Sequence, residues 1–346
     1  MKNKNNLLSP VTIRNHQFIS TIGLAGGYVK NFPEGEKLAR IDDCGFVEAG
    51  SYTIAPRTGN IGTTLVHEKP FTLNAIGLTN NGAEKSIPDL LKLKALYASL
   101  GKKLFISSAG MSIDEHPEMA KLFGPIADGF VLNAGCPNVY GKNGQKPIQS
   151  YDIDFMHESI RRVGEVLPDT CIFAVKVSPF KPYGFAQSIW PKMYSEFRKE
   201  GYTIVLKDSG FETSDELFEN VADSIKKCGR VDMIITMNTL PNVQIYADSP
   251  KDCLLNFHAA DSDVIQNTGG LSGAVVKELA LENVRMWNSE LWKTDIEICG
   301  CGGITNGEDM RRFLDAGASL VQIMSAHLLN NDGSKFGEIL ADCYSM

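Results

Sequence analysis

Short apolar runs rich in β-branched residues alternate along the chain with longer stretches in which apolar residues recur every three or four positions. The short runs are bounded by Gly, Pro, Asn or Ser, which is typical of buried strands. We predict eight strands, at 18–23, 45–51, 103–108, 129–133, 171–178, 232–238, 297–301 and 319–325. The longer stretches predict amphipathic helices, most clearly at 86–100, 154–166 and 308–316.

Eight strand-then-helix units predict an α/β fold with parallel strands, and their near-regular repetition favours a closed (β/α)8 TIM barrel over an open sheet. We predict a single barrel domain over residues 1–346. One crossover is longer than a barrel requires, because two helical patterns flank the strand-like segment 202–208 between Lys176 and Asn238. We therefore predict an insertion around 200–230.

Polar residues gather where the predicted strands end, which in a TIM barrel is where the chemistry lies. Carboxamides offer both a donor and an acceptor, so a barrel mouth lined by them suits a planar ligand with carbonyl and ring N–H groups. The residues at or just past the strand ends include Ala25, Gly26, Gly50, Ser51, Asn133, Asn138, Lys176, Asn238, Thr239, Gly302, Gly303, Met324 and Ser325.

Two strand ends late in the chain predict a phosphate site. CGCGGIT at 299–305 ends one strand and VQIMSA at 321–326 ends the next. Glycines there allow backbone N–H groups to approach a phosphate, and barrels often bind one between their last two strands. The alternative that these glycines only turn the chain stays open.

The segment NAGCPN at 133–138 predicts a reactive thiol. Cys136 lies just past a strand end, on a loop that can reach the barrel mouth. A cysteine pKa of about 8.5 allows a thiol to act as a base near neutral pH when its thiolate is modestly favoured. A half-buried structural thiol is the alternative.

Composition excludes several classes of protein. The formal net charge is −7 and the basic residues are scattered, so we expect no nucleic-acid binding. The chain has no apolar run of about 18 residues and no signal-peptide pattern in residues 1–18, so we expect a cytoplasmic protein without an integral membrane segment. The eight cysteines include no CxxC pair, which predicts free thiols and no metal site.

Five segments, in order along the chain, resemble the dihydroorotate dehydrogenases, a family of flavin enzymes on a (β/α)8 barrel. NAGCPN is similar to the NLSCPN signature of that family. The other four segments are LNAIGLTN at 73–80, VKVSP at 175–179, GGLSG at 269–273, and CGGI at 301–304 together with VQI at 321–323.

The resemblance implies oxidation of (S)-dihydroorotate to orotate in de novo pyrimidine (UMP) biosynthesis, with FMN at the carboxyl ends of the strands. It implies that Cys136 removes the carbon-5 proton while carbon 6 passes hydride to FMN, and that Lys30 lies beside both substrate and flavin. Lys176 corresponds to a lysine at the electron-rich end of the flavin. The residues implied to hold the pyrimidine ring are Asn74, Asn133, Asn138, Asn238 and Thr239. Those implied to hold FMN also include Ala25, Gly26, Gly50, Ser51, Asn133, Ser272, Gly273, Gly302, Gly303, Met324 and Ser325, the last four around the phosphate.

The segments resemble two branches of the family. Cys136 and the lack of an N-terminal helical extension are similar to the soluble branch, whereas GGYVK at 26–30 and VEAGSYT at 47–53 resemble the membrane-associated branch. The electron acceptor therefore stays open between fumarate, NAD through a partner subunit, and quinone. We expect a homodimer. The alternative functions are an FMN-dependent oxidoreductase acting on a dihydropyrimidine without the carboxylate, and a phosphate-binding barrel without redox chemistry.

Overall fold

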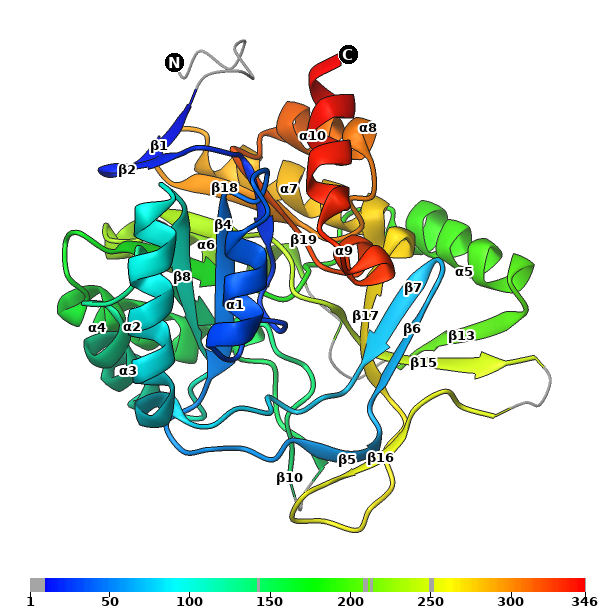
Figure 1. Cartoon of the computed structure of the whole chain (residues 1–346). Coiled ribbons are helices and arrows are strands. Elements are labelled where there is room, and N and C mark those ends of the chain that lie inside the picture. Colours follow the sequence, from blue (N-terminus) through cyan, green and yellow to red (C-terminus); the bar gives the residue numbers. More distant parts are fainter. Residues whose placement is uncertain (1–9, 142–143, 208–210, 212–213, 249–251, 346) are drawn as a thin grey trace.

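A closed barrel of eight parallel strands forms the centre of the computed structural model, which describes residues 10–141, 144–207, 211, 214–248 and 252–345 (Figure 1). The last strand pairs with the first, so the barrel sheet has no free edge. Eight strands, each overlapping one of the eight predicted ranges, confirm the (β/α)8 TIM barrel. In chain order they are β3 (Ile22–Leu24), β4 (Phe46–Tyr52), β8 (Lys103–Ser108), β9 (Gly129–Asn133), β12 (Ile172–Lys176), β14 (Met233–Ile235), β18 (Glu297–Cys301) and β19 (Leu320–Ile323).

The predicted strand at 18–23 is displaced from the observed one. Its first residue ends β2 (His16–Phe18), which forms an antiparallel hairpin with β1 (Val11–Ile13), and a turn separates this hairpin from β3. The hairpin closes the amino end of the barrel, where the ring of Phe18 packs edge-to-face on Phe46 with centroids 5.6 Å apart. The apolar run at 18–23 therefore contributes to two elements.

Helices surround the barrel, and the predicted helices at 86–100, 154–166 and 308–316 correspond to α2, α4 and α8. Within the described residues, no helix combines the length and the apolar composition needed to cross a membrane. The α-helices are α1 (Phe32–Ala39), α2 (Ala83–Ser99), α3 (Glu115–Phe123), α4 (Ile153–Val166), α5 (Trp190–Lys199), α6 (Asp215–Cys228), α7 (Lys277–Leu291), α8 (Gly307–Ala316), α9 (Ser325–Asn330) and α10 (Ser334–Ser345). Shorter helical segments are η1 (Gln149–Tyr151), η2 (Phe185–Ile189) and η3 (Ala274–Val276).

Side chains inside the barrel change from apolar to polar along the strands. Interior residues occupy alternate strand positions, and those nearer the amino ends form one apolar cluster that includes Phe46, Phe105, Val131, Ala174 and Leu320. Two residues further along the same strands stand Glu48, Ser107, Asn133, Lys176 and Gln322. The barrel therefore has an apolar interior beneath a polar layer at the carboxyl ends.

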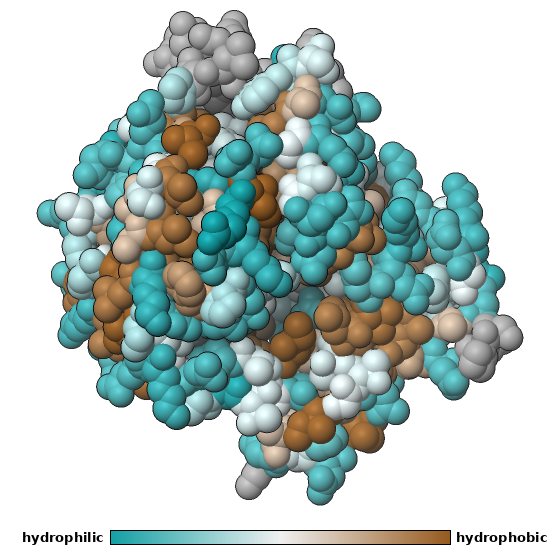
Figure 2. Space-filling view, in the orientation of Figure 1, coloured by the Kyte–Doolittle hydropathy of each residue, from teal (hydrophilic) through white to brown (hydrophobic). Residues whose placement is uncertain are grey.

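A second, antiparallel sheet lies beside the carboxyl ends of the barrel strands (Figure 1), and the sequence analysis did not predict it. Its strands come from three different crossovers, and Leu73, Val243 and Leu271 join it to the same apolar core as the barrel helices. In spatial order the strands are β13 (Tyr202–Leu206), β15 (Leu240–Ala247), β17 (Gly269–Gly273), β7 (Phe71–Asn74) and β6 (Leu65–Glu68). Two small ribbons pair β5 (Asn60–Thr63) with β16 (Asn256–Ala259), and β10 (Tyr140–Gly141) with β11 (Gly144–Gln145). Hydrophobic residues gather on the surface over β5, β6 and β7 (Figure 2).

The crossover between β12 and β14 contains the segment 200–230, in which the sequence analysis expects an insertion. Residues 208–210 and 212–213 lie outside the described part of the chain. β13 is an edge strand of the second sheet, paired with β15. By contrast, α6 packs against α4 and α7 as a helix of the outer ring. The described material that a plain barrel unit lacks is therefore η2, α5 and β13, whereas α6 belongs to the barrel itself.

Candidate active site

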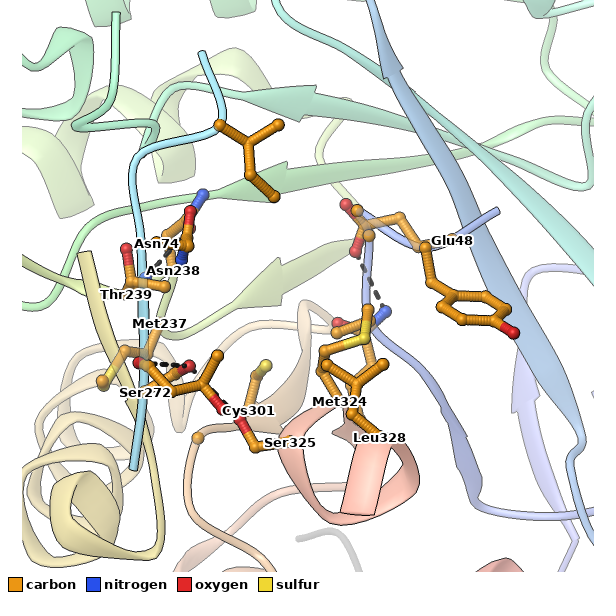
Figure 3. A pocket seen from close by; sticks show the side chains of 18 of the residues that line it. Glu48, Asn74, Met237, Asn238, Thr239, Ser272, Cys301, Met324, Ser325 and Leu328 are labelled. Atoms are coloured by element: carbon orange, nitrogen blue, oxygen red, sulfur yellow. Dashed lines mark hydrogen bonds between the residues drawn. The ribbon is translucent and has the colours of Figure 1, made fainter. Parts of the chain in front are cut away.

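A cavity of about 300 Å³ opens between the carboxyl ends of the barrel strands and the second sheet (Figure 3). Its lining contains all of the predicted site residues except Gly50. Gly50 lies behind it, where it accepts a hydrogen bond from the N–H of Gly27 at 2.9 Å and donates one to Val29 at 2.8 Å. The predicted residues in the lining are Ala25, Gly26, Lys30, Ser51, Asn74, Asn133, Cys136, Asn138, Lys176, Asn238, Thr239, Ser272, Gly273, Gly302, Gly303, Met324 and Ser325.

One side of the cavity carries neutral polar side chains, here called the amide wall: Asn74, Asn133, Asn138, Asn238 and Thr239. Asn133 Nδ2 donates to Ser51 Oγ at 2.8 Å, and Asn133 Oδ1 accepts from Asn238 Nδ2 at 3.0 Å. Asn238 Oδ1 accepts from the backbone N–H of Thr239 at 2.9 Å. These bonds fix the orientation of both amides.

The other half of the amide wall links a loop to the second sheet. Asn138 Nδ2 donates to Asn74 Oδ1 at 2.8 Å, and Asn74 Nδ2 donates to the carbonyl of Gly270 at 3.3 Å. Asn138 Oδ1 and Thr239 Oγ1 are buried and have no partner among the described residues. A buried polar atom without a partner costs free energy, so these two atoms are ready to pair with a ligand.

The opposite part of the cavity holds an ion pair, and we call Glu48, Lys176 and Gln322 the charged floor. Lys176 Nζ donates to Glu48 Oε2 at 2.9 Å, and Gln322 Nε2 donates to the same oxygen at 3.1 Å. The Lys176 and Glu48 side chains are only 5% and 0% exposed. Burial alone favours the neutral amine, but the carboxylate of Glu48 outweighs it and holds the pKa of Lys176 above its ordinary value.

The Glu48 carboxylate of the charged floor explains why residue 26 is a glycine. A Cβ on Gly26 would lie 2.4 Å from Glu48 Oε1, a contact that requires movement of the fully buried carboxylate. The loop after β3 can therefore pass over Glu48 only if residue 26 has no side chain.

Positive charges act on the thiol of Cys136. Lys30 Nζ donates to the carbonyl of Ser51 at 3.2 Å, and burial lowers the pKa of Lys30 to about 8. Burial raises the pKa of the Cys136 thiol, while the backbone N–H of Asn138 and the charges of Lys30, Arg57 and Lys176 act in the opposite direction. The site thus combines a half-buried thiol with positive charges that favour its thiolate.

The far end of the cavity has the features of an anion site. Gly302 and Gly303 have φ values of 119° and 81°, which favour glycine, and a Cβ on Gly303 would lie 2.7 Å from the backbone of Lys277. Ser272 Oγ and Ser325 Oγ lie 3.2 Å apart (Figure 3). This end of the cavity is therefore lined by glycine backbone without side chains and by two hydroxyl groups.

A second cavity of about 180 Å³ reaches Cys136 from another side. It shares Leu78, Asn133 and Cys136 with the first cavity, and its lining also includes the exposed residues Lys146 and Asp152. The second cavity therefore connects the neighbourhood of the thiol with the surface.

The dihydroorotate dehydrogenase family model matches residues 8–342. The chain belongs to the dihydroorotate dehydrogenase family. One similar protein is the catalytic subunit of dihydroorotate dehydrogenase B (NAD(+)) from Pyrococcus abyssi, which is 29% identical over 90% of this chain and 84% of its own length. The dihydroorotate dehydrogenase (fumarate) of Trypanosoma brucei brucei is 27% identical over 93% of this chain and 88% of its own length. The mitochondrial dihydroorotate dehydrogenase (quinone) of Schizosaccharomyces pombe is 26% identical over 93% of this chain and 70% of its own length.

Solved structures of dihydroorotate dehydrogenases have the same fold. The ligand-free enzyme of Eimeria tenella matches 99% of this chain and 88% of its own, with a TM-score of 0.72 and 20% sequence identity. This likeness shows the TIM-barrel fold, and the family match places the chain among flavin-dependent oxidoreductases.

The sequence analysis assigned no role to Glu48 and Gln322, which line the cavity, or to Arg57, whose charge acts on Cys136 from outside the lining. Alternation along β4 and β19 places Glu48 and Gln322 inside the barrel above Phe46 and Leu320, so periodicity contained a signal for both. Arg57 follows β4 in a loop, where it donates to the carbonyl of Gly77 at 3.2 Å, and no pattern in the sequence pointed to it. Among the described residues, no group of three or more His, Cys, Asp or Glu side chains forms a metal site.

Proposed function

We propose that this chain oxidises (S)-dihydroorotate to orotate in de novo pyrimidine (UMP) biosynthesis, with FMN as its cofactor and Cys136 as the base. The observation that carries the proposal is the meeting of a half-buried thiol, an amide wall and an end suited to an anion in one cavity at the carboxyl ends of a TIM barrel. The family to which the chain belongs supports the same reaction.

The residues present fit FMN. Gly302, Gly303, Ser272 and Ser325 form an end suited to a phosphate, and Lys176 offers a protonated amine at the floor. Two buried acceptors of the floor, Glu48 Oε1 and Gln322 Oε1, have no partner among the described residues. When bound, FMN supplies the acceptor for the hydride that leaves carbon 6 of the substrate.

Cys136 performs the proton transfer in this proposal. Carbon 5 loses a proton and carbon 6 a hydride, and the electron pair of the broken C5–H bond forms the new double bond between them. The thiolate sulfur of Cys136 accepts the proton. Burial raises the pKa of this thiol, so the thiolate is its minor form near neutral pH, and the charges of Lys30, Arg57 and Lys176 increase the thiolate fraction.

The amide wall and the nearby cations orient the substrate. Carboxamides match the carbonyl and N–H groups of a pyrimidine ring, and Thr239 Oγ1 and Asn138 Oδ1 are free to pair with it. The charge of Lys30, which lines the cavity, favours a substrate that carries a carboxylate over a neutral dihydropyrimidine. Dihydroorotate fits this charge better than dihydrouracil.

Anaerobic mixing with (S)-dihydroorotate tests the substrate. We expect purified protein to be yellow and to lose its visible absorption on mixing, whereas dihydrouracil leaves the spectrum unchanged within the same time. A yellow protein that only dihydrouracil bleaches would show a dihydropyrimidine oxidoreductase. A colourless protein that does not take up FMN would support a phosphate-binding barrel.

Cys136→Ala tests the base. We expect this variant to retain FMN and to be reduced by dihydroorotate about 10²–10⁴-fold more slowly, the usual contribution of a general base. Cys301→Ala is the matched control, since Cys301 also lines the cavity. Equal rates in both variants would remove the base role from Cys136.

The remaining predictions concern the setting of the enzyme. Relatives named for NAD, fumarate and quinone are all similar to this chain, so we propose to compare the three acceptors in turnover assays. A homodimer and a cytoplasmic location stay predictions, to be checked by sedimentation and by cell fractionation.

A further inference from the structure

Glu48 is the only carboxylate among the described residues that line the cavity. Lys176 has a role in the proposed reaction, whereas Glu48, the carboxylate paired with it, has none. Glu48 lies in β4, and its side chain is fully buried. A buried carboxylate at this place in the fold requires an explanation.

The position of the Glu48 carboxylate is fixed from several directions. Lys176 reaches it from β12, 128 residues away in the sequence, with β8 and β9 between the two strands. Gln322 donates from β19 to the same oxygen, and Gly26 leaves room above Oε1. Three separate strands and one loop therefore hold this carboxylate against the ammonium group.

Stability does not explain the pair. Replacing a buried ion pair by well-packed apolar residues is often neutral or stabilising, and the barrel has apolar residues at the equivalent positions one layer below. Both charged residues line the cavity, and Figure 3 shows the Glu48 side chain there. Their location indicates a role toward the ligand.

Electrostatics define that role. Reduction adds negative charge to a flavin, and an unpaired ammonium beside it strongly favours the reduced form. Glu48 places an opposite charge 2.9 Å from Lys176 Nζ, so the pair is close to neutral as seen from the cavity. We propose that Glu48 is a positioning residue whose carboxylate limits the positive charge that Lys176 presents to bound FMN, and thereby lowers the reduction potential of the flavin. This inference rests on the proposed function.

The other groups around Lys176 are consistent with this role. Cys301 and Cys299 from β18 are the further titratable side chains that act on its amine, and burial raises the pKa of both thiols. Both are therefore neutral at physiological pH, which leaves Glu48 as the negative charge facing Lys176.

Glu48→Gln in the FMN-loaded protein is the test. We expect a less negative midpoint potential in a spectroelectrochemical titration. We also expect tighter binding of sulfite, which adds reversibly to oxidised flavins and gives them a negative charge, with a Kd about tenfold lower or more. A slightly acidic buffer keeps Lys176 charged in the variant. Glu48→Asp retains the charge and should stay within about threefold of wild type.

Asp128→Asn is the matched control. Asp128 is also a buried carboxylate paired with a lysine, Lys94, but it precedes β9 at the amino end of the barrel. We expect this variant to lose stability without a change in potential or sulfite affinity. A shift in Asp128→Asn as large as that in Glu48→Gln would overturn the inference, because it would show a general effect of losing a buried acid.

A second pair of variants covers the case in which Glu48→Gln does not fold. Lys176→Met should lower the potential below that of wild type, and Glu48→Gln/Lys176→Met, which has a neutral floor, should bring it back. Identical potentials in these two variants, or in wild type and Glu48→Gln, overturn the role of Glu48. If dihydroorotate still bleaches the flavin in that case, the proposed function stands. If the wild-type protein binds no FMN, both are wrong.

Discussion

The amide wall and the charged floor line the same cavity but hold their polar groups in different ways. Asn133, Asn238, Asn138 and Asn74 are neutral and donate to one another, to Ser51 and to backbone. The floor depends on one ion pair, which is almost completely removed from solvent. An amide that loses a partner can pair with a ligand, whereas an ion that loses its partner becomes an isolated buried charge.

This difference separates two tasks. The wall can exchange hydrogen bonds within the protein for hydrogen bonds to a ring that enters and leaves at every turnover. The floor cannot rearrange at low cost, which suits a group that sets a constant electrostatic environment for a resident cofactor. Variants on the two surfaces should therefore differ in both the size and the kind of their effects.

Lys176→Met should have the largest effect on stability. It leaves Glu48 as an unpaired buried carboxylate, which costs about 3–5 kcal/mol in free energy of unfolding. Urea denaturation with FMN in the same excess throughout measures the loss. Glu48→Gln/Lys176→Met should recover most of it, because no charge is left unpaired. A double variant as unstable as Lys176→Met would show that packing, and not charge, dominates at the floor.

Asn133→Ala should cost less, although Asn133 makes more hydrogen bonds than Lys176. Its loss leaves the buried N–H of Gly135 and the partly buried amide of Asn238 without their acceptor. Neutral groups left in this way cost about 1–3 kcal/mol in unfolding free energy. The same urea titration compares the two surfaces directly. A loss equal to that of Lys176→Met would contradict the distinction between a neutral wall and a charged floor.

The barrel could be predicted from the sequence because each of its strands is a local signal. A run such as the one at 129–133 is apolar, short and followed by polar residues, and it forms β9 with these bounds. The second sheet depends on pairing between distant segments, such as Gly270 with Asn74, and only the segment at 202–208 looked strand-like by itself. Pairing at such separations leaves no periodic pattern in the sequence.

The site residues also divide into those that a local motif reveals and those whose role depends on contacts between distant segments. Cys136, Asn133 and Asn138 were found because they stand in one short motif, and the cavity brings them together with Asn74 and Asn238. Glu48 was missed because its role depends on an ion pair with Lys176, which lies 128 residues away in the sequence. Burial and pairing of charges are properties of the closed barrel, so neither residue alone reveals them.

Lys30 should make ligand binding depend on pH, in contrast to the amide wall, which does not titrate. Burial favours the neutral amine and lowers the pKa of Lys30 to about 8, so its charge is present below that pH and is lost as the pH rises through it. We expect the Kd for orotate to rise by up to about tenfold per pH unit above 8. Burial raises the pKa of the Cys136 thiol, so that group stays uncharged while Lys30 titrates.

Lys30→Gln is the control for this titration. It removes the only group of the pair that changes charge near pH 8, so its Kd for orotate should be higher at neutral pH and nearly constant up to about pH 9. Fluorescence or absorption titration of the bound flavin with orotate gives both curves. A variant that keeps the wild-type pH dependence would assign the titration to another group.

Thr239→Val should have the smallest effect on stability and still weaken ligand binding. Thr239 Oγ1 is buried and pairs with no described residue, so replacing the hydroxyl by a methyl group removes no hydrogen bond within the protein. We expect a change in unfolding free energy within about 0.5 kcal/mol, against about 1–3 kcal/mol for Asn133→Ala. If the Thr239 hydroxyl forms a hydrogen bond with the substrate ring, the Kd for orotate should rise about three- to tenfold, which is the effect on binding of losing one neutral hydrogen bond. A variant that loses stability but binds orotate normally would show instead that Thr239 supports the wall and does not contact the ring.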